Sequence, residues 1–173
     1  MATITKRNNS YRATVSLYKK GEYKRETKTF KNKKDAELWT LEMELEKGRG
    51  KNIAERSTLF TEFYSTWINT VKKNDVREST FINYMRTITV IESLFEGIKL
   101  KHLNDIVMQK KLDQYAETHS KKTTRELVLK IRDSLKYAYA RGLITNDFGS
   151  LLKSKGQEQE KGILLSLLLN SKK

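Results

Sequence analysis

Apolar and polar residues alternate near the start of the chain in a way that is typical of a β-sheet. In residues 11–17 every second residue is apolar, at Ala13, Val15 and Leu17, which is the period of a strand with one covered face. A second stretch, rich in Thr and Lys, ends at Phe30. Asparagine- and glycine-containing turns separate the stretches. The pattern predicts three strands, over residues 3–7, 11–17 and 23–30.

The periodicity becomes helical after Phe30. Between residues 33 and 47 apolar residues recur along the segment, and glycine follows at positions 48 and 50, as it often does where a helix ends. We expect this helix to pack on one face of the sheet and to leave the other face open. Its apolar positions are Ala36, Trp39, Leu41, Met43 and Leu45.

Residues 49–57 are polar and charged, the composition shift expected of a linker. From residue 58 onward the apolar spacing is helical, and no proline interrupts it. Thr58 is a candidate N-cap for the first helix of this part, and Asn104 or Asp105 for the third. The pattern predicts a bundle of four to five helices, over residues 59–71, 80–96, 105–119, 121–141 and 149–153.

The first two helices of this bundle each have an apolar side. Aromatic residues lie at i, i+3, i+4 and i+7 of the first helix, a spacing that is more typical of core packing than of a surface for stacking bases. We predict that they face inward, together with an aliphatic row in the second helix. The aromatic residues are Phe60, Phe63, Tyr64 and Trp67, and the aliphatic row is Ile82, Met85, Ile88 and Ile91 or Leu94.

Positive charge dominates the chain and is concentrated at its start. Of 173 residues, 35 are Lys or Arg and 21 are Asp or Glu, a net charge of +14 with a pI near 9.8. Residues 1–34 alone hold eleven Lys and Arg against two Glu. Such a polarised basic surface favours a nucleic acid as partner. A solvated, lysine-rich hairpin is the alternative interpretation.

Composition also bears on other classes of function. The chain has no Cys and two separate His, so we predict no disulfide, no metal site and no cofactor. Its longest aliphatic run, Ile163–Leu169, is far too short to span a bilayer. The N-terminus lacks the long apolar core of a secretory signal. We therefore expect a cytoplasmic protein with no membrane partner.

The predicted helix over residues 121–141 is apolar on one side and basic on the other. It carries seven Lys and Arg against Glu126 and Asp133. This distribution favours a helix that lies across DNA. We expect the backbone amides at its N-terminus to bind a further phosphate. A surface helix with scattered lysines is the alternative.

The order of these pieces resembles the N-terminal part of the tyrosine recombinases (integrases) of phages and transposons. The first unit is similar to their arm-type DNA-binding domain in Tyr11-Arg-Ala-Thr-Val15, in the glycine turn and in the run from Phe30 to Trp39. The helical unit is similar to their core-binding, SAM-like domain in Phe63-Tyr-Ser-Thr-Trp67, in Arg77-Glu-Ser-Thr80 and in the run from Leu135 to Ile144. The resemblance covers roughly residues 1–153.

The patterns and the resemblance together imply an α+β fold, a small three-stranded antiparallel sheet packed on one helix and followed by an all-α, SAM-like bundle. In such integrases the sheet domain binds accessory arm sites through the major groove, and the helical domain clamps the core crossover site. The expected layout is an arm-type DNA-binding domain over residues 1–48, a linker over 49–57, a core-binding domain over 58–153 and a linker-like tail over 154–173.

Carried over by position, the resemblance implies two sets of DNA contacts. Strand alternation from Phe30 puts Lys24 and Lys28 on the helix side of the sheet, unless a bulge exchanges the faces or the long side chains reach round an edge. The expected arm-site residues are Arg12, Thr14, Ser16, Lys24, Arg25 and Lys28, and the expected core-site residues are Ser79, Thr80, Lys121, Lys122, Thr123, Arg125 and Arg132.

Catalysis in this family needs an Arg, a Lys, a His-x-x-Arg pair and a Tyr nucleophile in a further domain. Neither His102 nor His119 begins a His-x-x-Arg pair, and Tyr137 and Tyr139 lie in a core-forming helix, so we expect no enzyme activity. The expected partner is double-stranded DNA in a bacterial host cell. The aliphatic tail Ile163–Leu169 is a possible contact for a full-length integrase or another protein.

Three functions stay open. The first is a non-catalytic DNA-binding protein of a mobile element that occupies attachment sites. The second is an inactive fragment of an active tyrosine recombinase. The third is an inhibitor, encoded by a phage or another mobile element, that reuses the DNA-binding scaffold to block a host nucleic-acid machine such as an RNA-guided nuclease.

Overall fold

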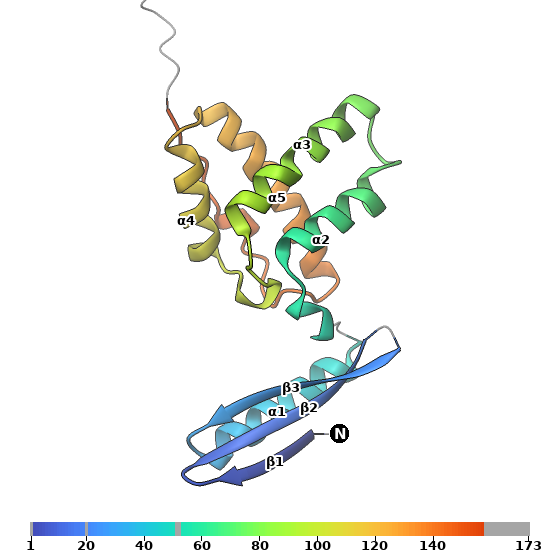
Figure 1. The fold of residues 1–173 in the computed structure, drawn as a ribbon, viewed down its shortest axis with the longest axis vertical. Coiled ribbons are helices and arrows are strands. Elements are labelled where there is room, and N and C mark those ends of the chain that lie inside the picture. The colour runs from blue at the N-terminus through green and yellow to red at the C-terminus, as the bar shows by residue number, and fades with distance from the viewer. Residues whose placement is uncertain (1, 20, 51–52, 158–173) are drawn as a thin grey trace, which may run out of the picture. The chain divides into compact units, whose positions relative to one another are not determined.

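The computed structural model describes residues 2–19, 21–50 and 53–157. Over these residues it contains a three-stranded sheet with one helix, followed by a set of helices (Figure 1), which confirms the predicted α+β class. Contacts divide the chain into two compact units, residues 1–103 with 134–147, and residues 104–133 with the segment from 148 onward. The layout with a linker over residues 49–57 stays a prediction, and the aliphatic tail lies outside the described residues.

The sheet has the order β1-β2-β3, and both neighbouring pairs are antiparallel. The pairing of β2 with β3 runs continuously from Tyr11 opposite Phe30 to Lys19 opposite Glu22, without a bulge. Asn8, in the first turn, has a φ of 49°, as two-residue hairpin turns require. The strands are β1 (Ala2–Arg7), β2 (Ser10–Lys19) and β3 (Glu22–Phe30).

Helix α1 (Lys33–Gly48) packs on one face of the sheet. The side chain of Asn32 caps its first turn by accepting a hydrogen bond from a backbone amide. Val15 and Leu17 of β2 form a buried cluster with Met43 of α1. The alternation in residues 11–17 therefore predicted the covered face correctly.

Two apolar positions of α1 do not lie on the side that covers the sheet. Leu41 and Leu45 are 59% and 52% exposed, whereas Ala36 and Met43 are buried. Residues two apart on a helix point to nearly opposite sides. The apolar residues from position 39 to position 45 therefore belong to two different faces of α1.

Residues 53–57 form a short 3₁₀ helix, η1 (Ile53–Ser57), inside the segment expected to be a linker. Ile53 and Ala54 are buried in the same cluster as Val15 and Met43. This end of the segment is therefore part of the core beneath the sheet. The charged residues around Ile53 and Ala54 give the segment the composition of a linker, so its burial could not be predicted from the sequence.

Arg56 in η1 is buried and has three hydrogen bonds. Its guanidinium donates two of them to the carboxylate of Glu46, at 2.6 and 3.1 Å. Its Nε donates a third to the backbone carbonyl of Gly142, at 3.0 Å. Arg56 thus joins the end of α1 to the turn that follows the longest helix.

The first unit also holds the first helices of the bundle. All four predicted core aromatics are buried, and the rings of Phe60 and Phe95 meet edge to face at 5.2 Å. The N-cap position of α2 is Leu59, which makes no side-chain cap hydrogen bond, so the expected cap at Thr58 is wrong. The elements are α2 (Phe60–Trp67), the π-helix η2 (Ile68–Lys72), α3 (Glu78–Phe95) and the 3₁₀ helix η3 (Leu100–His102).

The aliphatic row predicted for α3 is correct only in its second half. Ile91 is fully buried, but Ile82 and Met85 are 44% and 38% exposed. The buried positions of α3 begin at Thr87. Its N-terminal half therefore has no buried residue, although the Tyr84 ring meets the ring of the buried Trp67 at 5.8 Å.

The second unit is formed by α4, the first part of α5 and the segment after residue 147. Asn104 caps α4, because its Oδ1 accepts a hydrogen bond from the Val107 amide at 2.8 Å, as expected. The predicted last helix over residues 149–153 is a single 3₁₀ turn. The elements are α4 (Asp105–Ala116), α5 (Lys121–Ala140) and η4 (Gly149–Leu151). Among the helices in the described ranges, none has both the length and the apolar character needed to cross a bilayer.

Candidate nucleic-acid interface

The face of the sheet that α1 leaves uncovered is built from alternate residues of the three strands. The register pairs Arg12 with Thr29 and Ser16 with Arg25. These residues alternate with the buried Ala13, Val15 and Leu17, so they lie on the opposite side of the sheet. We call this side the open sheet face; its members are Thr3, Thr5, Arg7, Ser10, Arg12, Thr14, Ser16, Tyr18, Tyr23, Arg25, Thr27 and Thr29.

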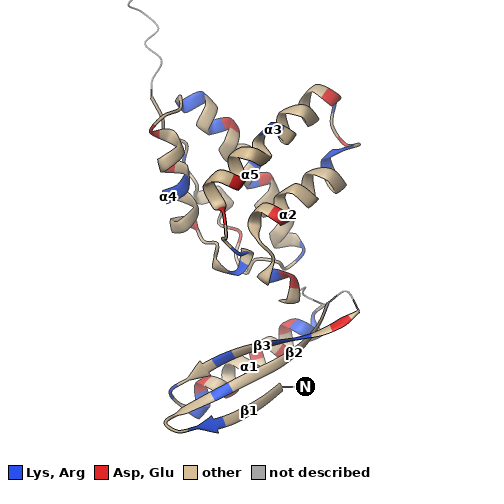
Figure 2. Ribbon diagram, viewed as in Figure 1, with Lys and Arg blue, Asp and Glu red and all other residues tan. Residues whose placement is uncertain are grey.

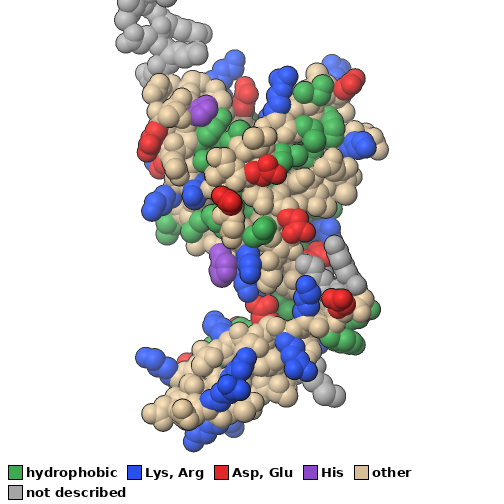
Figure 3. Space-filling model, in the orientation of Figure 1, with side chains coloured by type: hydrophobic (Ala, Val, Ile, Leu, Met, Phe, Trp, Pro, Cys, Tyr) green, Lys and Arg blue, Asp and Glu red, His purple; other side chains and the backbone are tan. Residues whose placement is uncertain are grey.

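The pleat divides charge between the two faces of the sheet. The described strand residues of the open sheet face include Arg7, Arg12 and Arg25 and no carboxylate. Glu22 and Glu26 both belong to the helix side. Lys and Arg are spread along the strands in the ribbon view (Figure 2), and they gather over the sheet in the space-filling view (Figure 3). Guanidinium and hydroxyl groups on such a surface are suited to phosphates and base edges.

The structure separates the six predicted arm-site residues into two groups. Arg12, Thr14, Ser16 and Arg25 lie on the open sheet face, and the hydroxyls of Thr14 and Thr27 are 3.4 Å apart. Lys24 and Lys28 lie on the helix side, as alternation from Phe30 indicates. The Lys28 ammonium is 5.2 Å from the centre of the Phe30 ring. Whether any of the six contacts DNA stays a prediction.

Two tyrosines at the tip of the hairpin were missing from the predicted set. Tyr18 and Tyr23 are 61% and 79% exposed, and their rings meet edge to face at 5.2 Å on the open sheet face. Their signal in the sequence is weak, because they flank a lysine-rich turn. Counting in twos from Phe30 assigns Tyr23 to the open side, along with Thr27 and Thr29.

The start of α5 forms a second basic surface, in the second unit. Lys121, Lys122, Thr123 and Arg125 are all exposed there. The amide of Thr123 donates to the side-chain oxygen of Ser120 at 3.2 Å, and the amide of Lys121 donates to the carbonyl of Gln157 at 3.2 Å. Two of the N-terminal amides that were expected to bind a phosphate therefore already donate to oxygen atoms of the protein. The side chains of Lys121, Lys122 and Arg125 are exposed, whereas the Thr123 hydroxyl lies 3.0 Å from the Ser120 hydroxyl.

Arg132 differs from the other basic residues predicted on α5. It is half-buried, and its guanidinium donates a hydrogen bond to the Leu152 carbonyl. Burial lowers the pKa of the neighbouring Lys130, with Glu126 acting in the opposite direction. In this structure Arg132 holds the chain that follows η4, and its role in DNA contact stays a prediction.

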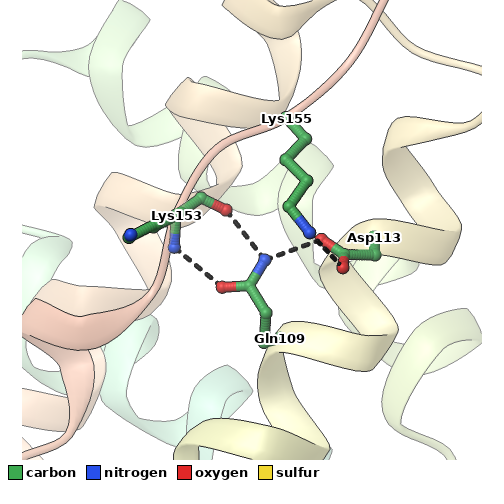
Figure 4. A network of polar contacts seen from close by, with 4 residues as sticks. All are labelled: Gln109, Asp113, Lys153 and Lys155. Atoms are coloured by element: carbon green, nitrogen blue, oxygen red, sulfur yellow. Dashed lines mark hydrogen bonds and ion pairs between the residues drawn. The ribbon is translucent and has the colours of Figure 1, made fainter.

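Residues 153–157 lie along α4 as an extended segment, which we call the strap. Gln109 exchanges two hydrogen bonds with the backbone of Lys153, at 2.8 and 3.0 Å, and donates a third to Asp113 at 2.7 Å (Figure 4). The ammonium of Lys155 donates to Asp113 at 2.6 Å and lowers the pKa of that carboxyl. The start of the expected tail, residues 154–157, is thus attached to the helices.

Ser79 and Thr80 lie in the first unit, in the first turn of α3, and both are exposed. They belong to the N-terminal half of α3, in which no residue is buried. The sequence grouped them with the basic residues of α5 as one core-site surface, which stays a prediction.

His119 and Tyr137, two of the residues singled out in the sequence, have structural contacts, whereas Tyr139 is 48% exposed. The ring of His119 stacks on Tyr115 with centroids 3.8 Å apart, and its Nδ1 lies 2.9 Å from the Tyr115 carbonyl oxygen. Tyr137 is half-buried on α5, and the guanidinium of Arg141 lies 5.9 Å from its ring centre. These contacts are those of packing and hydrogen bonding.

Comparison with known proteins finds a family that is similar to the first helices of the bundle. Residues 59–115 match the family described as phage integrase, N-terminal SAM-like domain. These residues are therefore similar to an integrase-type SAM-like domain, and the resemblance seen in the sequence is confirmed. No curated protein sequence matches the chain.

Solved structures extend the similarity. The N-terminal domain of the prophage pi2 protein 01, an integrase from Lactococcus lactis, is 25% identical with a TM-score of 0.55, over 58% of this chain and 96% of that one. Lambda integrase, as a tetramer bound to a Holliday junction, is 16% identical with a TM-score of 0.53. A lambda integrase dimer bound to a COC′ core site is 14% identical with a TM-score of 0.54. Both lambda comparisons cover 90% of this chain and 46% of the lambda chain, so they show a shared fold with a protein of which this chain spans less than half.

Proposed function

We propose that this chain binds double-stranded DNA, with the open sheet face in the major groove. The observation that carries the proposal is the division of charge by the pleat, which gives the open sheet face three arginines and leaves both strand carboxylates on the other side. A sheet that presents arginine, serine and threonine can bind phosphates and read base edges at the same time. We infer that the DNA it binds is an attachment site of a mobile element.

The basic start of α5 supports a second point of contact. Lys121, Lys122 and Arg125 are exposed within little more than one helical turn. Two lysines and an arginine in that space favour a run of phosphates, and they would position the protein without reading sequence. The lambda integrase structures that share the fold are bound to a Holliday junction and to a core site, which supports duplex DNA as the ligand of this chain.

The proposed activity is binding without phosphoryl transfer. The residues matched by the family lie in an N-terminal, SAM-like domain, and neither histidine begins a His-x-x-Arg pair. Occupancy of an attachment site would then compete with a recombinase for the same DNA. The alternatives, a recombinase fragment and an inhibitor of a host nucleic-acid machine, remain hypotheses.

Two double variants, made in strands β2 and β3, test the proposal. Arg12→Glu with Arg25→Glu reverses two charges on the open sheet face, and Lys24→Glu with Lys28→Glu reverses two on the helix side. Both change the net charge equally. We expect the arginine pair to weaken duplex binding by on the order of 100-fold or more, because each specific contact contributes about 1–3 kcal/mol, and the lysine pair to have a much smaller effect.

Equal losses in the two double variants would contradict the proposal, because net charge alone would then explain binding. Circular dichroism checks that both variants are folded. Recovery of bound partners from the native host separates the alternatives: attachment-site DNA supports the proposal, whereas a stoichiometric nuclease supports the inhibitor hypothesis.

A further inference from the structure

Two tyrosines end the open sheet face at the tip of the hairpin between β2 and β3. Tyr18 and Tyr23 are opposite each other in the register, and their rings meet edge to face with centroids 5.2 Å apart. The two residues are 61% and 79% exposed. Every other residue that we assign to this face is a threonine, a serine or an arginine. The open sheet face therefore has one apolar end, which we call the tyrosine pair.

The surroundings of the tyrosine pair favour a nucleic acid over a protein as its partner. Arg25 follows Tyr23 by two residues on the same face, and the described strand residues of that face include no carboxylate. A specific protein interface buries about 1,200 Å² or more in total, which is far more than two rings supply. A small apolar spot beside an arginine is instead suited to the edge of a base pair.

The major groove of a duplex offers a tyrosine ring one kind of apolar group. The flat faces of paired bases are stacked on one another, and most of the groove edge consists of hydrogen-bond donors and acceptors. Thymine alone among the four bases adds a methyl group there. The body of a tyrosine ring is apolar and gains from contact with a methyl group, while its hydroxyl can donate to a phosphate.

We propose that Tyr18 and Tyr23 determine part of the sequence specificity of this chain by contacting thymine methyl groups in the major groove. This inference rests on the proposed binding of duplex DNA by the open sheet face. It adds the kind of base that one end of that face reads, and it assigns the reading to two residues that carry no charge.

The register also predicts where the thymine lies. The pair of Tyr18 with Tyr23 and the pair of Ser16 with Arg25 are successive on the open sheet face. Successive side chains on one face of a strand are about 6.5–7 Å apart, and base pairs are about 3.4 Å apart along a duplex. For strands that run along the groove, the thymine therefore lies about two base pairs from the position that Arg25 contacts.

Replacing thymine by uracil tests the contact, because deoxyuridine lacks the methyl group and keeps the base pairing. The probes are duplexes that the parent chain selects from a random pool, prepared with thymine or with uracil. We expect the parent chain to bind the uracil form about 4- to 15-fold more weakly, for the loss of one or two methyl contacts. Uracil placed at one thymine at a time should locate the effect about two base pairs from the position at which Arg25→Gln relaxes specificity.

Variants of the tyrosine pair show whether these rings cause the preference for thymine. Tyr18→Thr with Tyr23→Thr keeps residues that are suited to strands, and we expect this variant to bind the two forms equally. Tyr18→Phe with Tyr23→Phe keeps both rings and should retain the preference. Tyr139→Gln is the matched control, because Tyr139 is a tyrosine on α5 that is 48% exposed, and it should also retain the preference.

The ratio of the two affinities separates base reading from a structural role of the rings. A cross-strand aromatic pair also stabilises a hairpin. Loss of that stability alone would weaken binding to the thymine and uracil forms in the same proportion, so the ratio would stay that of the parent chain. Circular dichroism checks that each variant is folded.

Three results would overturn the inference. One is equal binding of the thymine and uracil forms by the parent chain, and another is a preference for thymine that persists in Tyr18→Thr with Tyr23→Thr. The third is tighter binding to single-stranded DNA than to the duplex, lost in that same variant, because the rings would then stack on unpaired bases. The first two results leave the proposed function standing, whereas a parent chain that binds no duplex overturns both.

Discussion

Gly156 in the strap lies against the backbone of Lys121 at the start of α5. A Cβ at position 156 would lie 2.6 Å from the Lys121 nitrogen, and the residue has a φ of 142°. The strap can follow this path only because position 156 has no side chain. One glycine therefore determines the path of the strap past the start of α5.

We expect Gly156→Ala to lower the free energy of unfolding by about 2–5 kcal/mol, because overlap with the backbone and an unfavourable φ each cost about 1–3 kcal/mol. Gly97→Ala is the matched control. Gly97 has a φ of 71°, but a Cβ added there would have no atom within 4 Å, so we expect a loss of only about 1–2 kcal/mol. Urea unfolding followed by circular dichroism measures both. Equal losses would mean that the close approach to Lys121 has no energetic consequence.

Arg56 should contribute strongly to stability, because both it and its partner are largely buried. The side chains of Arg56 and Glu46 are 11% and 22% exposed. Arg56→Met leaves the Glu46 carboxylate and the Gly142 carbonyl without this donor, and we expect a loss of about 2–4 kcal/mol in the free energy of unfolding.

The exposed ion pair of Lys33 with Glu37 is the comparison for Arg56, since their side chains are 65% and 52% exposed. Lys33→Met should lower the free energy of unfolding much less than Arg56→Met, because solvent screens an exposed ion pair. Thermal or urea unfolding measures both variants. A loss in Arg56→Met as small as that in Lys33→Met would show that the buried pair adds nothing beyond a surface one.

The strap should open in acid. The Lys155 ammonium lowers the pKa of Asp113 below its usual value of 3.8. A carboxyl with a lowered folded pKa favours the folded state above its unfolded pKa, and this contribution is lost as the pH falls through the folded pKa. Exchange of the Gln157 amide, which donates to the His119 carbonyl at 3.1 Å, should therefore speed up below about pH 4 once intrinsic rates are removed. In Asp113→Asn this acceleration should disappear; if it persists, another group controls the strap.

The salt dependence of DNA binding should distinguish two adjacent residues of β3. Arg25 lies on the open sheet face and Lys24 on the helix side. Each lost phosphate contact reduces the slope of log affinity against log salt by about 1. We expect Arg25→Gln to show this reduction and Lys24→Gln to keep the slope of the parent chain. Titrations of one duplex over a range of salt concentrations give both slopes, and the reverse result would assign the DNA contact to the helix side.

Much of the fold could be predicted because local patterns and tertiary packing agree. Alternation in residues 11–17 gives the covered strand, and the row from Phe60 to Trp67 gives buried positions of the first unit. The failures occur where tertiary position decides. Leu41 and Leu45 share the spacing of core residues but face outward, and Ile82 lies in the half of α3 that has no buried residue.

The candidate site, too, could be predicted only in part. Alternation alone places Arg12 and Arg25 on one face of the sheet, and a continuous register was needed to exclude a bulge that would exchange Arg25 with Lys24. The strap had no signal beyond a glycine in a polar run. Its contacts to Gln109 and Asp113 join residues more than forty positions apart, which no local pattern encodes.

The continuous pairing of β2 with β3 also constrains how this protein can evolve. Because side chains alternate, adding or removing one residue inside β3 would exchange every side chain beyond that point with its neighbour's face. Carboxylates would then appear among the arginines, and an arginine would turn toward the core. Descendants of this sequence can vary the strand by substitution, or lengthen its hairpin at the tip, but a single-residue indel within it would disrupt packing and charge at once.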